Sequence, residues 1–81
     1  MVEPATLEQI LAYLRDDNQE VVIQGNQTER TFIAYELEDV VSQIYDADVI
    51  GIQIINNSLI IKLDDSYGYI DALLENPYNE N

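Results

Sequence analysis

The spacing of apolar and polar positions changes along the chain, and each change predicts a different element. Thr6 and Gln9 form a T-x-x-Q pattern that is typical of a capping box at the start of a helix. Apolar residues with helical spacing follow it, at Leu7, Ile10, Leu11 and Leu14. The pattern predicts an amphipathic helix over about residues 7–16.

The next segments predict a strand pair and then a second helix. Residues 20–24 are β-branched and precede Gly25-Asn26, so we expect a strand there. Residues 30–35 are its expected hairpin partner across a loop at about 25–29. Helical spacing then returns, at Leu37, Val40, Val41, Ile44 and Tyr45. This predicts a helix over about 36–46.

Residues 49–63 give the clearest pattern, because two apolar strands flank Asn56-Asn57. Asparagine tolerates the positive φ angles of a two-residue turn, so we expect a hairpin in which Ile55 lies opposite Ser58. One face then pairs Ile54 with Leu59, Ile52 with Ile61 and Ile50 with Leu63. The other face pairs Gln53 with Ile60 and Gly51 with Lys62. A slip by one residue would mix the two sets.

A last short helix is expected up to about Glu75, with Asp65-Ser66 as its N-cap and Pro77 after its end. We therefore predict one α+β domain over residues 1–81, in the order α-ββ-α-ββ-α, with frayed ends at 1–5 and 76–81. The sheet is expected to have four strands, mostly antiparallel, with the helices on one face. That face is the one lined by Ile50, Ile52, Ile54, Leu59, Ile61 and Leu63.

The composition is strongly acidic, with 16 Asp and Glu against 3 Lys and Arg and a formal net charge of -13. Because 47% of the 81 residues are hydrophobic, the chain differs from a disordered acidic segment. Phosphates of nucleic acids and anionic lipids are bound through Lys and Arg, so we expect no direct binding to either. The N-terminal residues do not resemble a secretory signal, and we expect a cytoplasmic protein.

Catalysis and metal binding have little support in the sequence. There is no histidine and no cysteine, so thiolate and imidazole chemistry and most zinc sites are excluded. Asp46, Asp48 and Gly51 match three positions of a calcium loop, but Asn57 stands where the bidentate Glu belongs. Carboxylate pairs are plentiful, yet no pocket for them is indicated. We therefore expect no enzyme, no cofactor and no specific metal site.

Asp65-Ser66 resembles the serine attachment site of acyl carrier proteins, which are also small and acidic. The resemblance covers two residues and the charge. Those carriers are helical bundles with the serine near the middle of the chain, whereas a β-hairpin is expected before Ser66 and only fifteen residues follow it. We interpret Ser66 as a helix N-cap.

The acidic residues and part of the six tyrosines are the candidate partner-binding residues. Tyr13 and Tyr45 are expected to be partly buried, whereas the C-terminal tyrosines lie among carboxylates and suit an arginine-rich surface. The predicted partner-binding residues are Glu36, Glu38, Asp39, Asp46, Asp48, Asp64, Asp65, Tyr67, Tyr69, Asp71 and Glu75.

Two hypotheses for function follow. In the first, the domain is an acidic interaction module that covers a basic surface of a partner protein, such as the nucleic-acid-binding surface of an enzyme, in the manner of an inhibitor or DNA mimic. The first hypothesis requires acids gathered on one side of the domain. In the alternative, it is a small regulatory or structural subunit or a homodimer, and it recognises partners through an exposed sheet face that includes Val22, Ile55 and Ile60. The charge then serves solubility.

Overall fold

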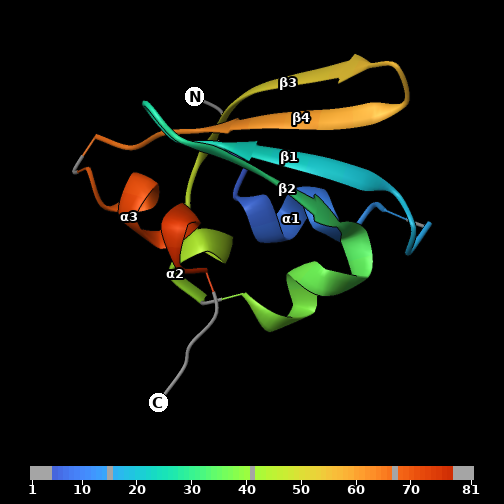
Figure 1. Ribbon diagram of the computed structural model, residues 1–81, viewed down its shortest axis with the longest axis horizontal. Coiled ribbons are helices and arrows are strands. Elements are labelled where there is room, and N and C mark those ends of the chain that lie inside the picture. The colour runs from blue at the N-terminus through green and yellow to red at the C-terminus, as the bar shows by residue number, and fades with distance from the viewer. Residues whose placement is uncertain (1–4, 15, 41, 67, 78–81) are drawn as a thin grey trace.

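The computed structural model describes residues 5–14, 16–40, 42–66 and 68–77, and its fold is α+β (Figure 1). Its elements, in chain order, are α1 (Leu7–Leu11), β1 (Glu20–Gln24), β2 (Glu29–Ile33), the 3₁₀ helix η1 (Ala34–Asp39), α2 (Ser42–Tyr45), β3 (Val49–Ile55), β4 (Ser58–Leu63) and α3 (Tyr69–Glu75). Of the ends that were predicted to fray, Ala5 accepts a hydrogen bond from Val49 and Pro77 is buried. Of the other terminal residues in that prediction, Asn76 is described, and residues 1–4 and 78–81 lie outside the described ranges.

The four strands form one mixed sheet in the order β2-β1-β4-β3. The hairpins β1–β2 and β3–β4 are antiparallel, and β1 pairs with β4 in parallel at the centre of the sheet. A parallel pair needs a long crossover. Here the crossover contains η1 and α2, which lie between the two hairpins in the chain. In Figure 1 these two helices, and also α1 and α3, lie beneath the sheet.

The predicted β3–β4 register is confirmed from the turn back to Gly51, and it is shifted at the beginning of β3. Asn56 and Asn57 have φ angles of 52° and 69°, as a two-residue hairpin turn requires. Ile54 lies opposite Leu59, and the predicted pairs continue to Gly51 and Lys62. The pairing of Ile50 with Leu63 is wrong, because a bulge lets Val49 take the position opposite Leu63.

The hydrophobic core lies between the helices and the inner sheet face. Its fully buried members include Val21, Ile23, Phe32, Ile61 and Leu63 from the sheet and Leu7, Leu37, Ile44, Ile70 and Leu74 from the helices. The prediction that Ile50, Ile52 and Ile54 lie under the helices is wrong, since all three are exposed. The helical layer covers β1 and β4, and the apolar side of β3 extends beyond it.

Two predicted helices are shorter than their hydrophobic spacing indicates. The capping box of Thr6 and Gln9 is confirmed, but α1 ends at Leu11. The helix predicted over 36–46 is divided into η1 and α2, because Val40 is extended, with φ -76° and ψ 158°. Val40 is nevertheless buried, so the apolar period persists although the helix does not.

Of the pair Asp65-Ser66 that was predicted to cap α3, only Asp65 does so, from before the N-cap position at Gly68. The buried carboxylate of Asp65 accepts hydrogen bonds from the backbone N–H groups of Ile70 at 2.9 Å and Asp71 at 3.1 Å. Ser66, in contrast, donates its hydroxyl to Asp64. Asp65 therefore satisfies the free amides of the first turn, and the interpretation of Ser66 as the N-cap is wrong.

Candidate functional site

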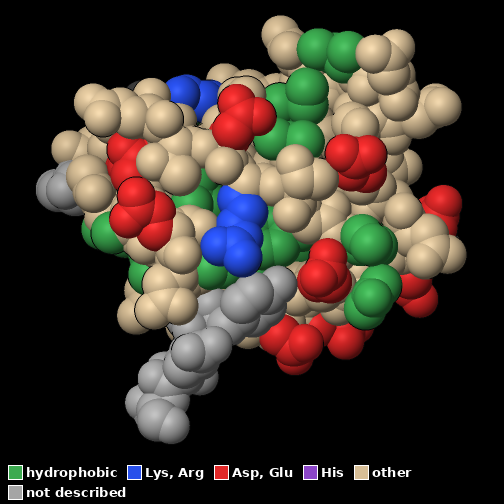
Figure 2. All heavy atoms as spheres, viewed as in Figure 1, with side chains coloured by type: hydrophobic (Ala, Val, Ile, Leu, Met, Phe, Trp, Pro, Cys, Tyr) green, Lys and Arg blue, Asp and Glu red, His purple; other side chains and the backbone are tan. Residues whose placement is uncertain are grey.

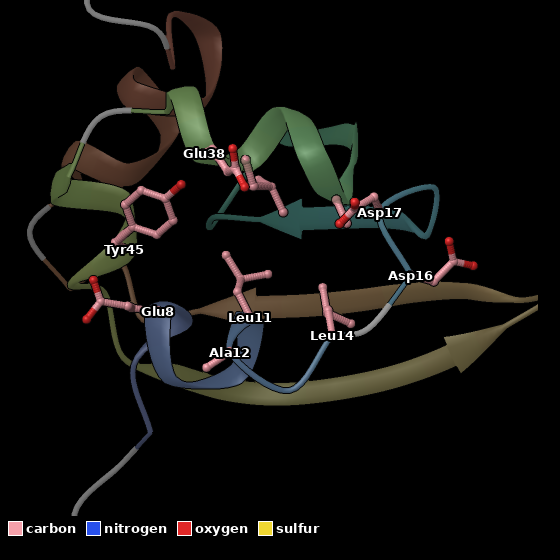
Figure 3. Close-up of a pocket in the computed structure, with 10 residues that line it drawn as sticks. Glu8, Leu11, Ala12, Leu14, Asp16, Asp17, Glu38 and Tyr45 are labelled. Carbon is pink, nitrogen blue, oxygen red and sulfur yellow. The ribbon is translucent and has the colours of Figure 1, made fainter.

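A groove with an apolar floor and an acidic rim lies between α1, η1 and α2 (Figure 3). Its volume is about 340 Å³. The lining residues are Glu8, Leu11, Ala12, Leu14, Asp16, Asp17, Ala34, Leu37, Glu38 and Tyr45. Leu11 and Leu14 point into the groove from below in Figure 3, and Tyr45 reaches toward it from one end. The groove is open to solvent on the helical side of the domain.

Three hydrogen bonds with backbone donors hold the walls of this groove in place. The α1 wall begins at the capping box, where Gln9 N–H donates to the Thr6 hydroxyl at 3.3 Å. The opposite wall is joined to the loop before β1, because Tyr35 N–H donates to the carbonyl of Asp17 at 3.1 Å and Ala34 N–H donates to that of Gln19 at 2.8 Å. The loop and η1 are therefore fixed to each other by backbone hydrogen bonds, without use of the carboxylates on the rim.

The four rim carboxylates are all exposed, and they come from three separate segments. Glu8 lies on α1, Asp16 and Asp17 lie in the loop before β1, and Glu38 lies on η1. Figure 3 shows Asp17 and Glu38 on the upper wall and Glu8 and Asp16 at opposite ends, where their carboxylates point outward. Asp16 also accepts a hydrogen bond from Asn18 N–H at 2.9 Å. A cation above the groove would meet the charges of Asp17 and Glu38 first.

The pKa of Tyr45 is raised at this end of the groove. Its side chain is half-buried, and this burial is the largest of the effects that raise the pKa of its hydroxyl above the ordinary 10.0. The carboxylates of Glu38, Asp39 and Glu8 raise the same pKa further. The phenol therefore stays neutral at physiological pH, and three carboxylates act on it together.

The groove offers apolar contacts and hydrogen-bond acceptors. Within residues 5–14, 16–40, 42–66 and 68–77, no cluster of three or more acidic side chains is arranged to hold a metal ion. The floor contributes methyl and methylene groups, and the rim contributes acceptors only, apart from the Tyr45 hydroxyl. Such a surface matches a ligand that combines positive charge with an aliphatic side chain, as Lys and Arg do.

The residues predicted to bind a partner are distributed over three places. Glu38 lines the groove and Asp39 follows it on η1, whereas the Glu36 carboxylate accepts a hydrogen bond from Ile33 N–H at 2.8 Å. Asp46 and Asp48 lie between α2 and β3, where Asp48 forms an isolated bridge with Thr6. The structure does not gather all of them into one face.

The predicted C-terminal cluster is largely used inside the domain. Asp65 is only 2% exposed, so its carboxylate is not accessible to a partner. Asp71 accepts hydrogen bonds from the N–H groups of Gln27 and Thr28 in the β1–β2 loop, each at 3.1 Å. The remaining described members, Asp64, Tyr69 and Glu75, are exposed, and Tyr67 lies outside the described residues.

Sequence reasoning missed Glu8, Asp16, Asp17 and Tyr45 as one site. Tyr45 is half-buried, in agreement with its prediction, whereas Tyr13 is 80% exposed and its predicted burial is wrong. The only signal available was that the three acids flank the apolar stripe of the first helix. Their proximity to Glu38 depends on how α1 packs against η1, which local spacing does not determine.

The carboxylates are absent from one part of the chain. Residues 49–63, which form β3 and β4, contain no Asp or Glu. In Figure 2 the acidic side chains lie over the middle, the sides and the lower part of the visible face, and none lies along the upper margin, where β3 runs. The surface charge is therefore unequal, with an uncharged edge at β3.

In the described part of the chain, no helix has the length and apolar character needed to cross a membrane. The chain matches no protein-family model, no curated protein and no solved structure.

Proposed function

We propose that this domain is a non-enzymatic interaction module that binds a cationic, amphipathic segment of a partner protein in the groove between α1, η1 and α2. The observation that supports the proposal best is the combination of an apolar floor, which includes Leu11 and Leu14, with a rim of four exposed carboxylates. Lysine and arginine side chains of a partner would lay their methylene groups on the floor and direct their charges to the rim.

The wider form of the proposal is that the bound segment belongs to a nucleic-acid-binding surface, which the domain blocks. Support for it is the net charge of -13, which attracts basic surfaces and repels phosphates. The groove adds a requirement that phosphate mimicry alone would not impose, because the partner must also present apolar groups. The domain would accordingly prefer an amphipathic basic segment to one rich in lysine alone.

The proposal is tested by calorimetric titration with a helix-forming peptide of lysine, leucine and alanine. A peptide with glutamate in place of lysine and one with serine in place of leucine serve as ligand controls. We expect binding of the first peptide only, and we expect its affinity to fall steeply as salt rises from about 50 to 500 mM, because exposed charges are screened. Equal binding of the serine peptide would contradict a role for the apolar floor.

Variants of the rim locate the site. Asp17→Asn with Glu38→Gln removes two charges at the groove and should weaken the peptide about fivefold, as expected for ~1 kcal/mol from two exposed ion pairs. Glu20→Gln with Glu29→Gln removes two exposed charges from the sheet strands β1 and β2 and is the matched control. Equal weakening by both pairs would indicate attraction to net charge alone and would contradict the groove.

The nucleic-acid form of the proposal needs a separate measurement. A partner retained by the immobilised domain at low salt is challenged with duplex DNA. Release of the partner would support competition for one basic surface, because DNA and the domain carry charge of the same sign. Retention in the presence of saturating DNA would limit the proposal to a basic surface that does not bind nucleic acid.

A further inference from the structure

The β3 edge of the sheet is long, apolar and uncharged. β3 is the last strand in the order β2-β1-β4-β3, and residues 49–61 contain no ionisable side chain. Ile52, Ile54 and Ile55 are 47%, 75% and 49% exposed. Proteins usually protect such an edge with charges, proline or a covering segment, because its free backbone groups can pair with another strand.

The chain protects only the beginning of this edge within the residues that the structure describes. Val49 N–H donates to the carbonyl of Ala5 at 2.7 Å, and Thr6 bridges Asp48. Ile55 and Ser58 flank a two-residue turn. The residues that flank such a turn form a hydrogen-bonded pair, and hydrogen-bonded pairs alternate along an antiparallel ladder, so Gly51, Gln53 and Ile55 direct their backbone groups to β4. The backbone groups of Ile52 and Ile54 are therefore directed to the free side of the strand.

From this edge we propose that the protein forms a two-fold symmetric dimer in which β3 pairs antiparallel with β3 of a second copy. Pairing centred on Gln53 keeps clear of Ala5 and Thr6. It places Ile52 opposite Ile54 of the other copy, with their edge-facing backbone groups hydrogen-bonded to each other. Both copies then contribute these isoleucines to one apolar cluster on the inner side of a continuous eight-stranded sheet.

The same register brings a projecting side chain of one copy opposite a hollow of the other. On the outer face it places Ile55 of each copy against Gly51, which has no side chain. A groove of about 320 Å³ lies there, lined by Gln24, Gly51, Ile52, Gln53, Ile60 and Lys62. Gly51 and Ile55 thus form a self-complementary pair, as a symmetric interface requires.

Charge favours a second copy as the occupant of this edge. Two chains with a net charge of -13 repel each other over most of their surfaces. Residues 49–61 bring no carboxylate to the β3 edge, so two copies can approach each other there. A basic partner, in contrast, gains nothing from an edge with no carboxylate and would bind on the acidic side.

The test is the oligomeric state measured by sedimentation equilibrium, from micromolar to millimolar protein and at low and high salt. We expect a dimer whose affinity increases with salt, because screening reduces the repulsion between two acidic copies. This response is opposite in sign to that of the cationic ligand, so the two proposals can fail separately. A monomer throughout the concentration range at high salt would overturn the dimer and favour a different protein as the occupant of the edge.

Two variants and a control identify the surface. Ile52→Lys should weaken the dimer about tenfold or more, because an unpaired ammonium group enters an apolar contact. Thr31→Lys makes the same charge change on β2, the opposite edge of the sheet, and should leave the dimer unchanged. A dimer that persists in Ile52→Lys would overturn the β3 interface.

Gly51→Val tests the register without depending on how Ile52→Lys folds. A Cβ at position 51 would lie 3.5 Å from the Cβ of Lys62, an ordinary contact, so the backbone of the monomer tolerates a Cβ there. We expect a circular dichroism spectrum like that of the natural protein and a dimer weakened about tenfold or more, because valine fills the hollow that receives Ile55. An unchanged dimer in this variant would overturn the proposed register.

Discussion

Gly25 in the β1–β2 loop lies against Asp71 of α3, so closely that a side chain at position 25 would displace the Asp71 carboxylate. A Cβ on Gly25 would collide with Oδ1 of Asp71, the atom that accepts hydrogen bonds from Gln27 and Thr28. The same turn is held from the other side, because the Lys62 ammonium group donates to the carbonyl of Gly25. The β1–β2 turn, α3 and β4 are thereby fixed to one another around one glycine.

Gly25→Ala should therefore lower the free energy of unfolding by about 1–3 kcal/mol, the range for a side chain inserted into a close contact. Urea unfolding followed by circular dichroism measures the change. In an Asp71→Ala background the same substitution should cost clearly less, since the colliding oxygen is gone. Additive costs in the double variant would show that the collision is not the cause.

The β3–β4 pairs from Gly51 and Lys62 to the turn could be predicted because their information is local. Two asparagines with positive φ fix the turn, and alternation of apolar residues fixes the register. The register fails only at the bulge near Val49, where Ala5 and Thr6 pair with the beginning of the strand. That contact joins segments more than forty residues apart in the sequence, so no local pattern could indicate it.

The helices and the groove were less predictable for a related reason. Apolar spacing continues through Val40, which is buried, but it does not reveal that the backbone there is extended. Glu38 was predicted as a binding residue from its charge alone. Glu38 lies near Glu8 and Tyr45 because of tertiary packing. The sequence shows only that Glu38 and Asp65 are acidic, and it does not show that Asp65 is buried and accepts a backbone hydrogen bond.

Asp65→Ala should lower the free energy of unfolding by about 2 kcal/mol, because two first-turn amides of α3 lose their acceptor and one of them is buried. Ser66→Ala removes only the hydroxyl that donates to Asp64 and should change stability by less than about 0.5 kcal/mol. Chemical denaturation of both variants measures the difference. Equal costs would contradict the assignment of Asp65 as the cap.

Two substitutions of Asn57, in the turn of the β3–β4 hairpin, should have different effects on the stability of the domain. Asn57 has φ of 69°, so Asn57→Gly should be neutral or should stabilise the domain, because glycine adopts this conformation without strain. Asn57→Ala should destabilise it by about 1 kcal/mol. Thermal unfolding of the two variants checks the order, and a more stable alanine variant would contradict the turn geometry.

Alkaline pH should destabilise the domain through Tyr45. Because burial and nearby carboxylates raise the pKa of Tyr45 in the folded state, its contribution to stability is complete below the unfolded value of 10.0. The contribution is lost as pH rises through the higher folded pKa. The free energy of unfolding of Tyr45→Phe should therefore fall less steeply above pH 10 than that of the natural protein. Tyr13→Phe, at a position that is 80% exposed, is the control for the loss of a tyrosine hydroxyl outside the groove.

The same phenol can detect a ligand in the proposed groove. A bound cationic peptide would offset the charges of Glu38 and Glu8, which help to raise the pKa of Tyr45. Ultraviolet titration of the phenolate, taken as the difference between the natural protein and Tyr45→Phe, should show this pKa lowered in the presence of the peptide. The variant Asp17→Asn with Glu38→Gln should begin with a lower pKa and respond less to the peptide. A bound peptide also buries the phenol further, which raises the same pKa, so the natural protein is compared with the variant, in which the balance of the two effects differs. If the peptide binds and the pKa of Tyr45 stays unmoved in both proteins, the ligand occupies a different acidic surface.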